Sequence, residues 1–533
     1  MFFLVFHENF TSYAMENWGL IFYRDARVLY NKNESSFADK QIVCLIVAHE
    51  IAHQWFGNLV TMEWWTDIWL NEGFATFMQY LCGHSVCPEL KLWHVYLTAD
   101  LKSAFDLDKL DSSHAILIDI DNPDEIGQVF DAISYKKGAA IIRMMHAWIG
   151  AENFRVGMSN YLKCFSYSNS ETVNLWEHLE KASGKPVVEV MGTWTRQKGF
   201  PVLTNKNGEI TVNSKNWIVP VFLEEKSEDG FKVILSRFGD TISNPNSSMV
   251  NPQRLGFYRA IQSAENLDMS ACDRLTLLSD AFYGVELGEI SVNEYVAMVK
   301  QDYRKETSYL VLKELFEHIN CLSTIFGKPF NDLLPEVELF EVEEEIRSTF
   351  ACKLIKSNVK VFSDSANFEN FEKLDSPLPK LYYGVYSGLF STEQMISEYE
   401  KASNVMKQSV AHVICTGCGD HETILNWIKS DSVANNDKPY YLVELAGQNK
   451  FSRNLVWDYL KNGQNWLDET YGSGLFLLPR LYKGVIEQFS CLNEVRGFVD
   501  EQFSQDRLKG AKSGILQGLE TVERYEAILM RNK

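Results

Sequence analysis

Apolar positions recur at helical spacing along most of the first 200 residues. Between Lys40 and Gly57 they lie three and four positions apart, which puts them on one face of a helix. After the aromatic bend at Trp64 and Trp65, the same spacing predicts a second helix from Asp67 to Leu81. Further helices are predicted over Leu90–Phe105, Tyr135–Trp148, Val156–Cys164 and Asn174–Ser183. The region is expected to be helix-rich, with a strand-like start.

The pattern changes after Phe200 and again near Asp273. Short β-prone runs, separated by Asn, Gly and charged turns, predict a small β-sandwich; they are Glu209–Val212, Trp217–Leu223 and Phe231–Leu235. Amphipathic helical segments then follow one another without a strict repeat; examples are Val292–Lys300, Tyr309–Asn320, Thr392–Lys401 and Val522–Met530. We expect an α+β multidomain protein with domains over 1–200, 201–262 and 263–533, the last an all-α helical array.

Length and composition agree with this division. A chain of 533 residues exceeds what one hydrophobic core supports, and 46% hydrophobic with 23% charged residues is ordinary globular composition. The formal charge of -20 repels phosphate backbones and anionic lipids, so we expect neither nucleic acid nor membrane as a partner. The acidic run Glu336–Glu345 is interpreted as solvated surface.

The cysteines and the amino end indicate a cytoplasmic protein. Ten cysteines in 533 residues form no dense framework, so reduced thiols are expected. The opening run Met1–Phe6 is apolar for only six residues and lacks a basic flank and a cleavage site, unlike a signal peptide. No apolar stretch is long enough to span a membrane.

Candidate chemistry centres on the segment His49-Glu50-Ile51-Ala52-His53. Histidines four positions apart lie on one face of a helix, within reach of a single ion, and a carboxylate beside them can take a proton from a water. Glu72, nineteen residues after His53 on the next predicted helix, could supply a third ligand. A His, His, Glu set is typical of catalytic zinc sites, so one Zn²⁺ per chain is expected.

Other candidate residues have weaker support. Asp67 could be a partner of a ligating histidine or a helix N-terminal carboxylate. The pair Cys415 and Cys418, close to Asp420 and His421, lacks the second pair that a zinc site of this kind needs and is interpreted as an incidental turn. Arg480 could face a substrate carboxylate or be structural.

Residues 49–77, HEIAHQWFGNLVTMEWWTDIWLNEGFATF, resemble the zinc signature of the gluzincin aminopeptidases. Upstream, Tyr13-Ala-Met-Glu-Asn17 is similar to that family's exopeptidase motif, and Asp131–Gly138 resembles the segment with its catalytic tyrosine. The sequence of residues 131–148 is similar to that of the puromycin-sensitive branch of the family, which is cytosolic. The resemblance implies a thermolysin-like zinc domain, followed by the β-sandwich and a helical array.

The resemblance also implies a role for each matching residue. Glu50 would be the general base and Tyr135 the hydroxyl donor to the oxyanion. Glu16 would hold the free ammonium group of a peptide, within a substrate-binding segment that also includes Ala14, Met15 and Asn17. The expected reaction is release of N-terminal residues from peptides that have a free amino end.

Two departures from the family leave alternatives open. Family members carry an N-terminal β-domain of about two hundred residues before the exopeptidase motif, and we expect it to be missing because the chain starts twelve residues before Tyr13. Tyr13 also stands where the family has glycine, so any left-handed backbone there would be strained. The alternatives are a zinc-binding member that acts by binding without turnover, and an epoxide hydrolase of the leukotriene type.

Overall fold

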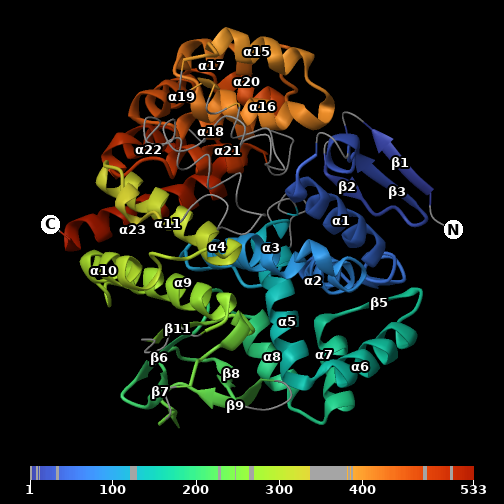
Figure 1. The fold of residues 1–533 in the computed structure, drawn as a ribbon. Helices are drawn as coiled ribbons and strands as arrows, with labels where there is room; N and C mark the ends of the chain where they lie inside the picture. The colour runs from blue at the N-terminus through green and yellow to red at the C-terminus, as the bar shows by residue number, and fades with distance from the viewer. Residues whose placement is uncertain are drawn as a thin grey trace. The chain divides into compact units, whose positions relative to one another are not determined.

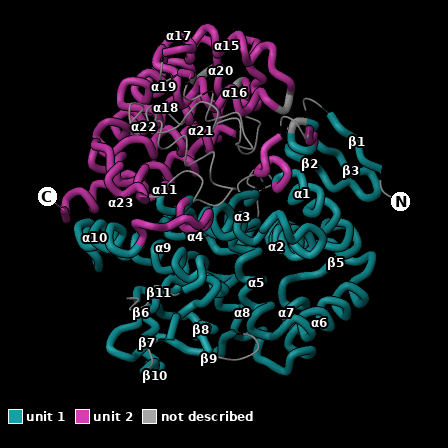
Figure 2. Tube along the Cα trace, viewed as in Figure 1, with its two compact units in different colours: residues 1–28, 42–302, 313–315 teal, residues 29–41, 303–312, 316–533 magenta. Residues whose placement is uncertain are grey.

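The computed structural model describes residues 3–7, 10, 12–31, 35–120, 126, 129–225, 230–245, 248–262, 269–336, 381, 384–385, 388–471, 477–504 and 508–532. These residues form two compact units, coloured separately in Figure 2. The first unit contains residues 1–28, 42–302 and 313–315, and the second contains residues 29–41, 303–312 and 316–533. Of the predicted acidic run, residues 337–345 lie outside the described ranges.

A three-stranded sheet begins the first unit (Figure 1). Its strands are β1 (Phe3–His7), β2 (Ala14–Met15) and β3 (Leu20–Arg24), in the order β1-β3-β2. Strand β3 is parallel to β1 and antiparallel to β2, with Ala14 opposite Tyr23. Ile21 and Tyr23 are fully buried, so alternate side chains of β3 face the core. The short 3-10 helix η1 (Asp25–Arg27) follows.

Two helices carry the HExxH segment and Glu72. Helix α1 (Phe37–Ala52) corresponds to the first predicted helix, and α2 (Trp69–Val86) to the second. Between them lie β4 (Val60–Met62) and the 3-10 helix η2 (Trp65–Asp67). Strand β4 pairs in parallel with β5 (Ser168–Ser170). Most of α2 is buried, as expected for a helix that is apolar on several faces.

The later helices of this unit match most of the predicted ranges. They are η3 (Pro88–Leu90), α3 (Leu92–Val95), η4 (Tyr96–Asp100), α4 (Leu101–Asp108), η6 (Ile133–Lys137), α5 (Gly138–Ile149), α6 (Ala151–Cys164), α7 (Thr172–Ser183) and α8 (Val187–Thr195). Elements η4 and η6 are π-helical turns. The ranges predicted as helices, Leu90–Phe105 and Tyr135–Trp148, are therefore helical apart from Lys91, and each includes residues of a π-helical turn.

Two small sheets follow the helices. The strands are β6 (Val202–Lys206), β7 (Glu209–Val212), β8 (Ile218–Glu224), β9 (Phe231–Arg237), β10 (Thr241–Ser243) and β11 (Arg259–Gln262). One sheet has the order β10-β7-β6-β11 and the other pairs β8 with β9. The 3-10 helix η7 (Pro252–Arg254) precedes β11, and helices α9 (Ala271–Leu287) and α10 (Val292–Asp302) follow it.

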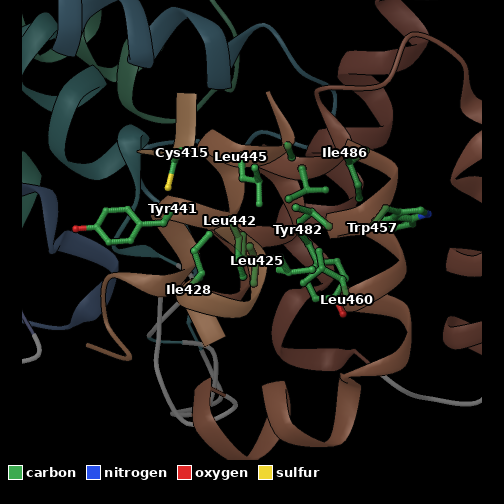
Figure 3. Close-up of a cluster of buried hydrophobic side chains, with 14 of the residues drawn as sticks. Cys415, Leu425, Ile428, Tyr441, Leu442, Leu445, Trp457, Leu460, Tyr482 and Ile486 are labelled. Atoms are coloured by element: carbon green, nitrogen blue, oxygen red, sulfur yellow. The ribbon is translucent and has the colours of Figure 1, made fainter. Parts of the chain in front are cut away.

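The second unit consists mainly of helices. They are α11 (Tyr309–Phe326), η8 (Asn331–Leu333), α15 (Thr392–Lys401), α16 (Asn404–Gly417), α17 (His421–Lys429), α18 (Lys438–Ala446), α19 (Lys450–Asn462), α20 (Gln464–Tyr471), α21 (Leu477–Ile486), η11 (Leu492–Glu494), α22 (Arg496–Ser504), η12 (Lys509–Ala511) and α23 (Lys512–Arg531). Their apolar faces meet in a core that includes Leu442, Trp457 and Tyr482 (Figure 3). The predicted C-terminal helical array is present.

No helix in the described ranges is both long and apolar enough to cross a membrane.

Candidate active site

The ring nitrogens of two histidines and one carboxylate oxygen converge between α1 and α2. His49 Nε2 lies 3.1 Å from His53 Nε2, and each lies 3.3 Å from Glu72 Oε2. The two rings meet nearly edge to face, at 83°. Their helical spacing of four residues brings both nitrogens to one face of α1, opposite the first turn of α2. These three residues form a candidate metal centre.

The opposite ring nitrogen of each histidine has an acceptor. His53 Nδ1 lies 3.0 Å from the main-chain oxygen of Phe56, and His49 Nδ1 lies 2.8 Å from Gln79 Oε1. A carbonyl oxygen only accepts, so each Nδ1 carries the hydrogen and each Nε2 presents its lone pair to the cluster. Two lone pairs that face each other at 3.1 Å, next to a carboxylate oxygen, are a donor set that fits a cation.

Electrostatics within the cluster are strongly coupled. Burial lowers the pKa of His53, but the charge and the hydrogen bond of Glu72 outweigh it and raise that pKa to about 10. Burial raises the pKa of Glu72, but the two histidines outweigh it and hold that pKa well below its usual range. The site therefore keeps Glu72 ionised and attracts positive charge, and a metal ion would replace the proton that His53 Nε2 otherwise holds.

Glu50 is buried beside the cluster. Burial raises the pKa of its carboxyl group to about 7; His49 and His53 oppose this rise, and the charge of Glu16 adds to it. Its Oε2 atom has no hydrogen-bond partner among the described residues. A desolvated carboxylate with a pKa near neutrality is suited to proton transfer.

The segment that contains Glu16 is hydrogen-bonded to residues that directly follow α1. The main-chain oxygen of Glu16 accepts hydrogen bonds from Gln54 Nε2 at 3.2 Å and from Asn58 Nδ2 at 2.9 Å. Gln54 Oε1 also accepts from the main-chain nitrogen of Gly19 at 3.3 Å. A carboxylate oxygen of Glu16 lies within 4.8 Å of Glu50 and His53. The structure thus brings Glu16 to the candidate metal centre.

The other residues of the predicted substrate segment surround Glu16. Ala14 and Met15 form β2, which pairs with β3. Ala14 is half-buried, whereas Met15 and Asn17 are exposed. Tyr13 is exposed and its ring lies 4.4 Å from the guanidinium carbon of Arg27. Its backbone is not left-handed, so the expected strain at this position is not found.

Tyr135 reaches the cluster from the π-helical turn η6. Its ring is nearly parallel to that of His49, with centroids 6.1 Å apart. Burial raises the pKa of Tyr135 well above its ordinary value, and the charge of Glu72 and a hydrogen bond to it add to the rise. The phenol therefore stays protonated and can donate. Single π-helical turns of this kind are frequent at functional sites.

A close contact between two glycines joins α2 to the start of α5, directly after η6. A Cβ atom on Gly73 would lie 3.2 Å from backbone atoms of Gly138, and one on Gly138 would lie 3.2 Å from the Cα of Gly73. The helices that carry Glu72 and Tyr135 approach each other closely because neither residue has a side chain there. The sequence motif contains Gly73 but does not reveal its partner.

The weaker candidates have other contacts or form no metal-type cluster among the described residues. Asp67 Oδ1 accepts hydrogen bonds from the main-chain nitrogen of Thr172 at 3.0 Å and its hydroxyl at 2.6 Å, so Asp67 is not a partner of the ligand-type histidines. Cys415 and Cys418 are buried and free, and neither belongs to a metal-type cluster in the described ranges. Arg480 donates to the Tyr440 hydroxyl at 2.7 Å, within the second unit.

Sequence reasoning missed Gln54, Asn58 and Gln79. Gln54 and Asn58 lie directly after the HExxH segment, and Gln79 lies seven positions after Glu72. The helical spacing of Gln79 from Glu72, two turns along one face, could have drawn attention to it. No pattern in the sequence indicates that Gln54 and Asn58 bind the main chain of Glu16.

Comparison with known proteins identifies relatives over nearly the whole chain. The model of the peptidase family M1 domain matches residues 1–194. Aminopeptidase M1 of Arabidopsis thaliana is 30% identical over 597 residues, covering 97% of this chain and 67% of that protein. Probable aminopeptidase 2 of Sulfurisphaera tokodaii is 31% identical, covering 99% of this chain and 71% of that protein. Glutamyl aminopeptidase of Sus scrofa is 37% identical, covering 62% of this chain and 39% of that protein.

Proposed function

This chain belongs to the M1 peptidase family and is a metallo-aminopeptidase, and we propose that it releases N-terminal residues at one Zn²⁺ held by His49, His53 and Glu72. The observation that carries the proposal is the convergence of two Nε2 lone pairs and a carboxylate oxygen within 3.3 Å of one another. Zinc takes imidazole nitrogens and carboxylate oxygens, and two His with one Glu leave a position open for catalysis.

Glu50 is proposed as the general base. When bound, the zinc ion would act as a Lewis acid that polarises the scissile carbonyl and makes a water more acidic. The carboxylate of Glu50 would take the proton of the attacking water and deliver it to the nitrogen of the leaving peptide. Its raised pKa, about 7, supports both steps, because the carboxyl group can accept and release a proton near neutral pH.

Tyr135 is proposed as the donor to the oxyanion. Its hydroxyl stays protonated because burial and the charge of Glu72 both raise its pKa. A neutral phenol that donates a hydrogen bond where negative charge develops stabilises the transition state more than the ground state. No proton needs to leave Tyr135 during the reaction.

Glu16 is proposed to bind the ammonium group of the substrate. Its carboxylate lies next to Glu50, where a cation would find two acidic side chains. Ala14, Met15 and Asn17 would line the same segment and contact the substrate main chain or first side chain. Peptides with a free amino end are therefore the proposed substrates.

We also propose the domain division 1–200, 201–262 and 263–533, with a thermolysin-like zinc domain and a β-sandwich before the helical array. All strands from β6 to β11 lie within residues 202–262, which supports a separate middle domain. A cytoplasmic location is proposed because ten cysteines are spread over 533 residues without a dense framework.

The test measures bound zinc and hydrolysis of aminoacyl fluorogenic amides, for the wild-type chain and for Glu50→Ala. We expect one zinc per chain in both proteins and turnover that falls by about two to four decades in the variant. Equal turnover in the two proteins would overturn the assignment of Glu50. Zinc without any turnover in the wild-type chain would instead favour a member that acts by binding.

A further inference from the structure

A hydrogen bond leads from the ring of His49 to a buried side chain on the next helix. The acceptor of His49 Nδ1 is Gln79 Oε1, at 2.8 Å. Gln79 is buried on α2, two helical turns after Glu72 and on the same face. One helix therefore supplies both a ligand-type oxygen and the side chain that orients the neighbouring ligand-type histidine.

The amide atom that faces the ring decides where His49 carries its hydrogen. The Gln79 oxygen only accepts, so the hydrogen of His49 lies on Nδ1 and its lone pair on Nε2, toward His53 and Glu72.

We propose that Gln79 is a positioning residue that holds His49 in its metal-binding tautomer. The inference rests on the proposed zinc site. A neutral amide orients the imidazole without placing a negative charge on its Nδ1–H, whereas a carboxylate partner would also make the ring a stronger donor.

The experiment measures the apparent zinc dissociation constant of the full chain by competition with a chromogenic chelator. Gln79→Met removes the acceptor at similar volume, and we expect zinc to bind about 10- to 100-fold more weakly, the usual effect of losing such a partner. Gln79→Glu restores an acceptor, and we expect binding at least as tight as in the wild-type chain.

Tyr161→Phe is the matched control. It removes a buried hydroxyl that bonds to Ser170 in the same unit, so it should leave the zinc constant unchanged. Wild-type affinity in Gln79→Met would overturn the inference while leaving the zinc site intact. A wild-type chain that binds no zinc would overturn the proposed function as well, and the two failures are therefore distinguishable.

Discussion

At the scale of single residues, the proposed role of Glu16 is to recognise the amino end of the substrate. Glu16→Gln removes the charge but keeps the shape, so we expect KM for aminoacyl amides to rise about 10- to 100-fold, as when a hydrogen bond to a charged group is lost. Steady-state kinetics measure this effect, with Glu63→Gln as the control because Glu63 is exposed. An unchanged KM in Glu16→Gln would contradict the proposed role.

His114 is expected to make stability depend on pH. Its Nε2 lies 3.0 Å from Asp131 Oδ2 and its Nδ1 lies 2.7 Å from the main-chain oxygen of Ala115, so both nitrogens face acceptors and the imidazolium fits best. Burial lowers the pKa of His114, but the hydrogen bond and charge of Asp131 outweigh it and raise that pKa above its ordinary value of 6.5.

The pKa of His114 is higher in the folded chain than in the unfolded chain. Its contribution to stability is therefore complete below about pH 6.5 and is lost as the pH rises through the folded-state pKa. We expect the free energy of unfolding of the wild-type chain to exceed that of His114→Gln by more at about pH 5.5 than at about pH 8.5. Denaturant titrations at the two pH values measure the difference. The opposite order would show that His114 is neutral in the folded chain.

Several residues proposed for the chemistry could be found from sequence because a short segment contains them. His49, Glu50 and His53 share a five-residue segment whose spacing has few other uses. Gln79 was not assigned in this way, since its role depends on the contact with His49, thirty residues away in sequence. Asp67 shows the converse: its place in the sequence suggested a partner of histidine or a helix N-terminal carboxylate, and it accepts hydrogen bonds from Thr172.

At the scale of elements, the contact between Gly73 on α2 and Gly138, the first residue of α5, sets how closely the turn η6 approaches α2. Gly138→Ala would put a Cβ atom 3.2 Å from the Cα of Gly73, tighter than most such contacts, so the helices must move apart. We expect kcat to fall roughly 10-fold, because small misplacements of a catalytic group are costly, with zinc retained. The variant tests whether the position of Tyr135 depends on this contact.

Gly192→Ala on α8 is the matched control for this substitution. Its added Cβ atom would meet nothing within 4 Å, so kcat should stay at the wild-type value and helix propensity should improve. Equal kcat in Gly138→Ala and Gly192→Ala would contradict the role given to the glycine contact.

Helices and strands with a strong period could be predicted with small errors, as for Thr392–Lys401, which is α15 with the same bounds. The π-helical turns at 96–100 and 133–137 could not, because one extra residue in a turn hardly alters the apolar spacing. Tyr135 lies in one of them. Helix α8 and the strands β6, β10 and β11 were also missed, since short elements carry few repeats of any pattern.

At the scale of the whole molecule, the two units have separate hydrophobic cores, and every residue proposed for the active site belongs to the first. Leu442→Ala makes a cavity in the core of the second unit, so we expect about 2–5 kcal/mol of destabilisation there. Denaturant unfolding would report this loss, while the zinc constant should match that of the wild-type chain. If Leu442→Ala lost zinc binding at temperatures where its second unit remains folded, the zinc site would not be independent of the core of the second unit.

The switch from mixed structure to a helical array was visible in the sequence because the apolar period changes along the chain. The assignment of residues to the two units was not, since residues 29–41 and 303–312 belong to the second unit although they are next to the first in sequence. Such assignments depend on contacts between residues that are far apart in sequence, and the pattern of apolar residues along one sequence does not show these contacts.

The two hydrogen bonds from Gln54 and Asn58 to the main chain of Glu16 fix the spacing between the two ends of the proposed site. Gln54 is next to His53, so the proposed anchor for the amino end is tied to the segment that contains a proposed zinc ligand. A shift of this segment would move both together and keep the distance between them. We therefore expect that distance, and not the length of the peptide, to set how many residues each cycle releases.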